Sequence, residues 1–315
     1  MEIGSVNEIA RLTHILFPNP NSWYTAEAKI SNFKEEKILK MKKISFSWLH
    51  DLIRKLYDNL KTEGIRLTSI YFSPSLPKNI DRNTIYLECK PSILSFCLRD
   101  WGIFTKKYFL SATQLSHYSK KLYGNVIDMF VKKLSSLNIP VYEAGVEGGS
   151  FISNGKIGIV SMKNELSKYK ELIDECGELY NFPEINLHID SIISFLGEDV
   201  YLMNYDLLKT ISEDLEYSIC CNFKRIEKLV EKMKEKKYSQ IKINGYYYGS
   251  EASVVTNILN IGKRKVVVVD NKGYVEKLVS REGFDVINLY PTKSFEMMKN
   301  LYVGIRCITL PVKRE

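Results

Sequence analysis

GIRCITLPVKR, residues 304–314, lies at the end of a 315-residue chain and is the stretch from which the fold is best inferred. In it, a glycine, an arginine and a cysteine stand at the head of an apolar run that is typical of a β-strand. A single cysteine is most often a small apolar core residue. Cys307 therefore acquires a chemical role only if the rest of the chain supplies polar partners for it.

The composition is that of a folded globular protein with a large core, since 45% of the residues are hydrophobic and 26% are charged. No stretch approaches the roughly 18 consecutive apolar residues that a membrane span needs. The start, MEIGSVNEIARLTHILF, lacks the basic head and apolar run of a secretory signal. We therefore expect a soluble, cytoplasmic protein that has no membrane partner.

The net charge of +8 raises the question of an anionic partner. The lysines, however, alternate with glutamates, as in KRIEKLVEKMKEKKY at 224–238, and this pattern is typical of a solvated helix face. No basic patch is interleaved with aromatic residues, so we expect no nucleic-acid partner. The glycine-rich motifs of dinucleotide and P-loop sites are absent, as is a G-x-S-x-G elbow, and we expect no cofactor.

The cysteines form no C-x-x-C pair, and none joins a histidine at the spacing of a zinc site, so neither a metal site nor a disulfide framework is expected. In a reducing cytoplasm they are free thiols, most of which pack in the core. The cysteines are Cys89, Cys97, Cys176, Cys220, Cys221 and Cys307.

Amphipathic periodicity predicts helices, and short runs rich in β-branched and aromatic residues predict strands between them. The helices are expected at 117–137, 164–180, 222–237, 251–261 and 272–282, and the strands at 68–72, 83–89, 104–111, 139–145, 156–161, 199–204, 265–270 and 284–290. The order strand, strand, helix, strand recurs about five times at a period of around 50 to 60 residues. We therefore predict one α/β domain over residues 1–315, built of small mixed sheets around a centre, in which the course of the first eighty residues or so stays open.

Four short polar stretches stand at the ends of these units: LRDWG at 98–102, VEGGS at 146–150, LHIDS at 187–191 and GIRCITLP at 304–311. Taken alone, each has an ordinary explanation. Glu147 can cap a turn in which the two following glycines supply positive φ. His188 and Asp190 are two positions apart, so in a strand they share one face and can satisfy each other's hydrogen bonds.

In this order and spacing, the four stretches resemble the motifs of the pentein superfamily of guanidino-group-modifying enzymes, the arginine deiminases and amidinotransferases in particular. The family pattern is an R-D turn, an E-G-G turn, an H-x-D strand and a late cysteine, with an ending similar to G-G-x-R-C-x-T-x-P-x-x-R. The resemblance runs from roughly residue 85 to the end, and Asn257 in VVTNIL matches an asparagine of the last repeat. It implies a five-bladed α/β propeller. Val303 and Ser150 depart from the pattern at positions that shape loops.

The resemblance also implies a covalent mechanism, with Cys307 as the nucleophile and His188 as the proton carrier. Water attacks the resonance-stabilised carbon of a guanidinium very slowly, whereas a thiolate is a strong nucleophile. His188 would protonate the departing nitrogen and then take a proton from the incoming water or amine.

Carboxylates are the natural partners of this flat cation, because each accepts two parallel N–H bonds and fixes the orientation of the guanidinium. Asp100 and Glu147 are expected to form such a clamp and to take part in catalysis, with Asp190 binding the substrate from the far side. Arg306 acts as a mobile gate, contacts a substrate carboxylate or forms a structural ion pair. Cys97, three residues before Asp100, lines the pocket or packs in the core.

The leading function is hydrolysis of arginine or an arginine-like guanidine, with transfer of the amidino group to an amine as the alternative. A non-catalytic ribosome- or RNA-binding factor of the same fold is a second alternative, and a thiol peptidase using Cys307 and His188 is a third. The enzyme is favoured because a binding protein has no need of this set of polar residues. The exact guanidine, the anchor of its distal end and the oligomeric state, a homo-oligomer included, stay open.

Overall fold

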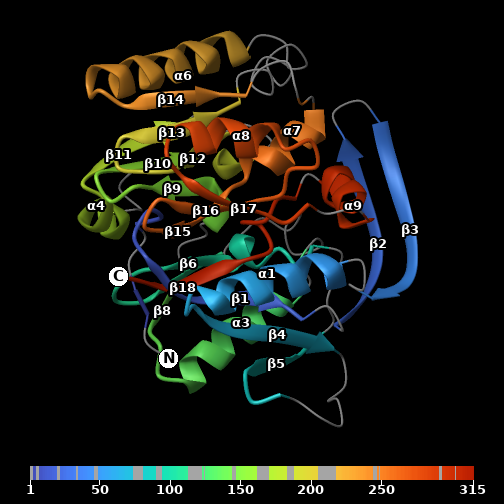
Figure 1. Cartoon of the computed structure of the whole chain (residues 1–315). Coiled ribbons are helices and arrows are strands. Elements are labelled where there is room, and N and C mark those ends of the chain that lie inside the picture. Colours follow the sequence, from blue (N-terminus) through green and yellow to red (C-terminus); the bar gives the residue numbers. More distant parts are fainter. Residues whose placement is uncertain are drawn as a thin grey trace. The chain divides into compact units, whose positions relative to one another are not determined.

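The computed structural model describes most of the chain, and the fold is given for those residues (Figure 1). Outside the description are residues 1–2, 5–6, 20–21, 33–34, 46–48, 74–80, 90–93, 113–122, 124, 144–146, 162–169, 183–187, 205–217, 244–246, 248, 291–292 and 302. Only the backbone is described at 23–32, 35–45, 170–171, 173, 182, 218–226, 249 and 293. The first parts of the helices predicted at 117–137 and 164–180 therefore lie outside the described residues.

Four consecutive segments of the described chain repeat the order strand, strand, helix, strand. In each, the first two strands pair antiparallel, and the third returns after the helix to pair parallel with the second. A parallel pair needs such a crossover, whereas an antiparallel pair needs only a short turn. Figure 1 shows α6 running alongside β14 in one of these units. The units are β6 (Gly102–Phe104), β7 (Phe109–Ser111), α3 (Val126–Ser136) and β8 (Val141–Glu143); β9 (Phe151–Ser153), β10 (Ile157–Ser161), α4 (Lys170–Cys176) and β11 (Glu178–Phe182); β12 (Ile193–Phe195), β13 (Val200–Met203), α6 (Ser218–Glu235) and β14 (Ser239–Lys242); and β15 (Leu259–Gly262), β16 (Lys265–Val268), α8 (Tyr274–Arg281) and β17 (Asp285–Asn288).

A fifth sheet follows the same plan but takes its first strand from the other end of the chain. Its order is β18-β1-β4-β5, and α1 (His50–Thr62) lies between the parallel strands β1 and β4. Arg11 and Glu315 exchange both of their backbone hydrogen bonds, which is the pattern of an antiparallel pair. The last strand of the chain therefore completes the first repeat. The strands are β1 (Leu12–Pro18), β4 (Arg66–Ser73), β5 (Thr84–Glu88) and β18 (Leu310–Arg314).

An additional hairpin is inserted in this first repeat, between β1 and α1. It consists of β2 (Trp23–Asn32) and β3 (Glu35–Ser45), which pair antiparallel with each other as a sheet of two strands. This insertion and the distant first strand explain why the beginning of the chain does not show the repeat in its sequence.

By its internal contacts, the chain divides into two compact units. Unit 1 consists of Met1–Gly4, Thr13–Gly148 and Ile308–Lys313, and unit 2 consists of Ser5–Leu12, Gly149–Cys307 and Arg314–Glu315. Unit 1 contains the sheets β18-β1-β4-β5 and β6-β7-β8 with the hairpin, and unit 2 contains the other three sheets. Whether the whole chain acts as one domain over residues 1–315 stays a prediction.

An aromatic cluster anchors the R-D turn within unit 1. Trp101, next to Asp100, is fully buried, and its ring centroid lies 5.1 Å from that of Phe130 in α3. Phe130 in turn makes an edge-to-face contact with Phe109 of β7 at 5.4 Å. Such aromatic pairs contribute about 0.5–1.5 kcal/mol each beyond the burial of their area. The turn that carries Asp100 is therefore fixed by its neighbour in the sequence.

An aliphatic cluster anchors the H-x-D stretch within unit 2 in the same way. Ile189 and Ile192, on either side of Asp190, are fully buried in a cluster with residues of β9, β10, β12, β13 and α6. Burying an isoleucine side chain contributes about 1.5–3 kcal/mol. These two side chains hold the backbone of Asp190 in place.

Most predicted strands are found, as β4, β5, β8, β10, β13, β16 and β17, with small differences in their bounds. The single strand predicted at 104–111 is wrong. Thr105 Oγ1 accepts the N–H groups of Lys107 and Tyr108, which closes a turn, so the segment forms the hairpin β6-β7. The helix predicted at 164–180 is too long, because Gly177 adopts a φ of 72° and β11 begins directly after it.

The helices predicted at 222–237 and 272–282 are found as α6 and α8, and the described part of 117–137 contains α3. The helix predicted at 251–261 is two elements, α7 (Gly249–Thr256) followed by β15. Among the described α-helices, α1 and α9 (Lys293–Leu301) were not predicted. No helix in the described part of the chain is long and apolar enough to cross a membrane.

Candidate functional site

The first carboxylate of the candidate site, Asp100, lies in unit 1 on the 3-10 helix η2 (Leu98–Trp101). Its side chain is buried, with 4% of the residue exposed. The hydroxyl group of Tyr123 donates a hydrogen bond of 2.7 Å to Asp100 Oδ2. Hydrogen bonds to charged groups contribute about 1.5–3 kcal/mol, so this contact fixes the orientation of the carboxylate.

The pKa of Tyr123 responds to Asp100 and also to the second predicted carboxylate, Glu147. Burial raises the pKa of Tyr123 well above its ordinary value, and the negative charges of Asp100 and Glu147 raise it further. The phenol therefore stays protonated at neutral pH and remains a donor. Within unit 1, Asp100 is therefore in direct contact with Tyr123, and the charge of Glu147 is near enough to act on the pKa of the same phenol.

Tyr123 was not predicted as a site residue. It lies inside the stretch 117–137, where periodicity predicts a helix and a tyrosine is unremarkable. Cys97 is 1% exposed and also acts on the pKa of Tyr123, so it is a buried neighbour of this group. Of the two roles considered for Cys97, its burial favours packing.

The E-G-G turn needs its glycines for a reason other than the predicted one. Neither Gly148 nor Gly149, on the 3-10 helix η3 (Gly148–Ser150), has a positive φ. A Cβ atom on Gly148 would instead lie 2.3 Å from the backbone oxygen of Arg99. The expectation of positive φ is therefore wrong, and the glycine permits close approach of the E-G-G turn to the R-D turn in unit 1.

In unit 2, the imidazole of His188 lies directly against the second glycine. A Cβ atom on Gly149 would lie 2.4 Å from His188 Nδ1 and 2.7 Å from Cγ. His188 itself is extended, but Asp190 belongs to the 3-10 helix η5 (Ile189–Ser191). The predicted strand with both residues on one face is therefore wrong, because the backbone turns after His188 and closes with a bond from Ser191 N–H to its carbonyl.

Cys307 lies in a turn of residues 305–308, and β18 begins only at Leu310, so the cysteine precedes the strand rather than heading it. The carboxamide of Asn257 organises this turn. Its Oδ1 accepts hydrogen bonds from the backbone N–H groups of Arg306 at 2.7 Å and Cys307 at 3.2 Å, and lies 3.7 Å from Cys307 Sγ. Its Nδ2 donates to the carbonyl oxygen of Asp190 at 3.2 Å. One buried side chain therefore joins the Cys307 turn to the Asp190 turn.

The glycine of the ending has a steric reason as well. A Cβ atom on Gly304 would lie 2.2 Å from Cβ of Asn257. Any larger residue would push the asparagine away from the backbone groups that it binds. The G-x-R-C spacing therefore reflects the place that Asn257 occupies.

Arg306 is buried in unit 2 and bound by two carboxylates. Its Nη2 donates to Glu8 Oε1, and its Nε lies 3.9 Å from Asp190 Oδ2. The exposed fractions of the Arg306, Glu8 and Asp190 side chains are 7%, 8% and 0%. Of the alternatives for Arg306, the structure contains the ion pair. A role as a mobile gate and contact with a substrate stay predictions, as does substrate binding by Asp190.

The remaining thiols and imidazoles with described side chains have structural explanations. Burial raises the pKa of Cys89 and Cys176 to about 12, so both thiols stay protonated at neutral pH. His14 is buried and bonded to Thr68 Oγ1 at 3.0 Å, and burial lowers its pKa to about 4. His50 is exposed at the start of α1. His117 and the side chains of Cys220 and Cys221 lie outside the description.

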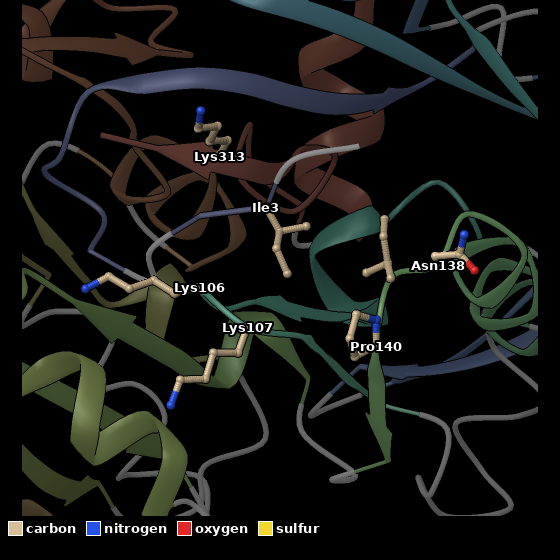
Figure 2. A pocket seen from close by; sticks show the side chains of 7 residues that line it. Ile3, Lys106, Lys107, Asn138, Pro140 and Lys313 are labelled. Atoms are coloured by element: carbon tan, nitrogen blue, oxygen red, sulfur yellow. The ribbon is translucent and has the colours of Figure 1, made fainter.

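Two open hollows of the described surface contain none of the predicted site residues. One, of about 450 Å³ in unit 1, is lined by Ile3, Lys106, Lys107, Asn138, Ile139, Pro140 and Lys313. Figure 2 shows that its lysine side chains extend in different directions rather than toward one point. The other, of about 530 Å³ in unit 2, is lined by Ile9, Lys156, Leu196, Gly197, Glu198, Asp199 and Arg264. Among the described side chains, no three of His, Cys, Asp or Glu are grouped to hold a metal ion.

No protein-family model matches this chain, and no curated protein matches its sequence. Solved structures match over nearly the whole length. The N-terminal domain of ArgZ, an arginine dihydrolase from the ornithine–ammonia cycle in cyanobacteria, has a TM-score of 0.66 at 14% identity, covering 96% of this chain and 98% of that chain. SxtG, an amidinotransferase of Microseira wollei in saxitoxin biosynthesis, has a TM-score of 0.62 at 13% identity, covering 100% and 98%. The agmatine deiminase of C. jejuni has a TM-score of 0.58 at 14% identity, covering 99% and 96%.

At these identities, the matches establish the fold. They agree with the repeated small mixed sheets and with the order of the helices and strands described above. This chain has the pentein fold, which it shares with enzymes that act on guanidino groups.

Proposed function

We propose that this protein modifies the guanidino group of arginine or an arginine-like compound through a covalent intermediate on Cys307, and that water resolves the intermediate. The observation that carries this proposal is the Asn257 side chain, which bonds the backbone of the thiol turn and of the Asp190 turn at once. Structures similar in fold support it, since cysteine-to-serine variants of ArgZ and of the C. jejuni agmatine deiminase were solved with substrate bound. The ending R-C-x-T-x-P-x-x-R favours the hydrolytic alternative.

In the first step, the Cys307 thiolate attacks the central carbon of the guanidinium. The tetrahedral adduct collapses with cleavage of one C–N bond, and His188 gives a proton to the departing nitrogen, which leaves as ammonia. An S-alkylthiouronium remains on the cysteine. In the second step, His188 takes a proton from water, which attacks the same carbon, and the C–S bond breaks to give a ureido product and the free thiol.

Asp100 and Glu147 supply the charge for binding the cation in this proposal. Asp100 and Glu147 both act on the pKa of Tyr123; as two negative charges they repel each other when no cation is bound, and a guanidinium relieves that repulsion. Tyr123 stays neutral and donates to Asp100, so it orients this carboxylate without neutralising the negative charge that binds the substrate. A neutral ureido product loses this attraction, which favours its release.

Transfer of the amidino group to an amine is a second candidate, because SxtG and the inosamine-phosphate amidinotransferase StrB1 of Streptomyces griseus share the fold. Purified protein is incubated with arginine and then with agmatine, with and without acceptor amines. Ammonia and a ureido product indicate hydrolysis, whereas release of ornithine or putrescine that depends on the acceptor indicates transfer. A conservative control is Cys307→Ser, which is expected to abolish either reaction.

A binding protein of the same fold is the competing class. Tight binding of RNA by a wild-type protein that turns over no guanidine would favour the binding protein over the enzyme. Turnover that Cys307→Ser abolishes would exclude the binding protein. A cytoplasmic location and the lack of a nucleic-acid partner remain predictions from the sequence, and the oligomeric state stays open.

A further inference from the structure

The N-terminal segment Ser5–Leu12 belongs to unit 2, although the chain on either side of it belongs to unit 1. Backbone and side-chain bonds hold it there. Glu8 N–H donates to the carbonyl oxygen of Ser153 at 2.9 Å, and the carbonyl oxygen of Ala10 accepts Nη1 of Arg314 at 2.8 Å. Glu8 is thereby placed with its side chain buried.

The side chain of Glu8 is the direct ionic partner of Arg306, the residue before the proposed nucleophile. Arg306 also lies near Asp190, which is completely buried. Removing one member of a buried ion pair leaves an uncompensated charge in a poorly solvated place, so such groups are strongly coupled. The position of the Arg306 guanidinium and the neutralisation of its charge therefore depend on Glu8.

The position of Arg306 has a chemical consequence in an enzyme that attacks guanidinium groups. Its side chain is itself a planar guanidinium, and it is one residue from the thiol. If it were not held, it could occupy the place of a substrate cation, and its charge would stabilise the thiolate. A partner that binds Arg306 elsewhere keeps the substrate's place open and prevents the guanidinium from lowering the pKa of the thiol.

We propose that Glu8, delivered by the N-terminal segment, is a positioning residue that holds Arg306 against Asp190 and away from the substrate's place beside Cys307. This inference rests on the proposed function. Charged groups that bind Arg306 include Glu8 from the segment and Asp190 from the H-x-D stretch, and the neutral carboxamide of Asn257 bonds the backbone of both the Asp190 turn and the Cys307 turn. The proposed function adds His188 as the proton carrier of the reaction at Cys307.

The test is Glu8→Gln in the full chain, with two readouts. The first is the rate of alkylation of Cys307 by iodoacetamide against pH, with the labelled residue identified by peptide mass spectrometry. Loss of the negative charge of Glu8 leaves Arg306 less neutralised, so the profile is expected to shift to lower pH. The second readout is steady-state turnover of the guanidine. We expect KM to rise about tenfold or more while kcat changes less, because the Arg306 side chain, no longer held by Glu8, competes with the substrate for its binding place.

The matched control is Glu198→Gln, which breaks a surface ion pair with Lys156 whose side chains are 63% and 68% exposed. It is expected to change neither readout. The combination Glu8→Gln with Arg306→Met removes both partners. Since Glu8 acts through Arg306, its substitution is expected to have no further effect on the labelling profile in the Arg306→Met background.

The inference is overturned if folded Glu8→Gln keeps the wild-type labelling profile, or if its shift persists without Arg306. If Glu8→Gln does not fold, Glu8→Asp is measured, and its shorter side chain is expected to give a smaller shift in the same direction. Alkylation needs no guanidine substrate. If the wild-type protein turns over no guanidine, the proposed function is refuted. The alkylation profiles still show in that case whether Glu8 is coupled to the thiol.

Discussion

Replacing Gly149 by alanine adds a methyl group where the imidazole of His188 now lies. The added Cβ would be 2.4 Å from His188 Nδ1 and 3.0 Å from His188 Cβ, so rotating the ring alone does not relieve the contact. Reaching an ordinary separation requires the ring to move by about 1 Å, and a displacement of that size at a reacting group can cost about 100-fold in rate. We expect kcat to fall by about that factor.

The fold is expected to tolerate this substitution. Gly149 does not have a positive φ, and His188 is only partly buried, so the ring can move toward solvent. The free energy of unfolding should change by less than about 1 kcal/mol, as for an alanine whose backbone conformation is compatible. Circular dichroism during thermal unfolding and steady-state turnover of the guanidine measure the two effects on the same sample.

Gly148→Ala is the contrasting variant. Its Cβ would meet the backbone oxygen atoms of Arg99 at 2.3 Å and Gly102 at 2.6 Å, and these cannot move without the turns that carry them. We expect it to lose about 1–3 kcal/mol of stability, the usual cost of overpacking. Wild-type kcat in Gly149→Ala would refute the role of His188, and equal destabilisation of both variants would refute the steric account of the two glycines.

Tyr123→Phe removes the hydrogen-bond donor to Asp100. In steady-state kinetics we expect KM to rise about tenfold with a smaller change in kcat. An unchanged KM would show that the bond does not orient the carboxylate. Asn257→Ala removes the acceptor for two backbone N–H groups of the thiol turn. It is expected to lower the free energy of unfolding by about 2–3 kcal/mol and to abolish turnover, whereas Asn257→Asp, which keeps the acceptor, should be milder in urea titrations. The pKa of His14 is lowered by burial from 6.5 to about 4, so the unfolded chain takes up a proton in that interval and the folded chain does not. Wild-type stability should therefore be complete above pH 6.5 and fall by up to about 3 kcal/mol toward pH 4, and His14→Gln should flatten this dependence where exposed His50→Gln does not.

Strands that the sequence predicts well are those in which local composition is decisive, such as the valine run of β16. The helix predicted at 251–261 shows the limit of such patterns, because apolar residues continue from α7 into β15 and their spacing alone cannot separate a helix from a buried strand. The first repeat could not be found locally at all. Its first strand is β18, which follows at the other end of the chain.

The candidate site residues could be proposed from the sequence because four motifs stand in a family order, whereas the residues that contact them could not. Tyr123 and Glu8 act through contacts across long sequence separations, 23 and 298 residues, which no local pattern records. The glycines of the E-G-G turn illustrate a different limit. Both a positive φ and a close approach require glycine, and only the structure shows that close approach is the reason here.

The central claim, that Cys307 attacks a guanidino carbon, is tested most directly by mass spectrometry of protein quenched during turnover with arginine or agmatine. The account predicts an adduct on the peptide that contains Cys307, with the mass of the substrate less ammonia, which is absent from Cys307→Ser. An adduct with the mass of the amidino group alone would keep the nucleophile but indicate transfer. Turnover without any adduct on Cys307, or with the adduct on another residue, would contradict the account.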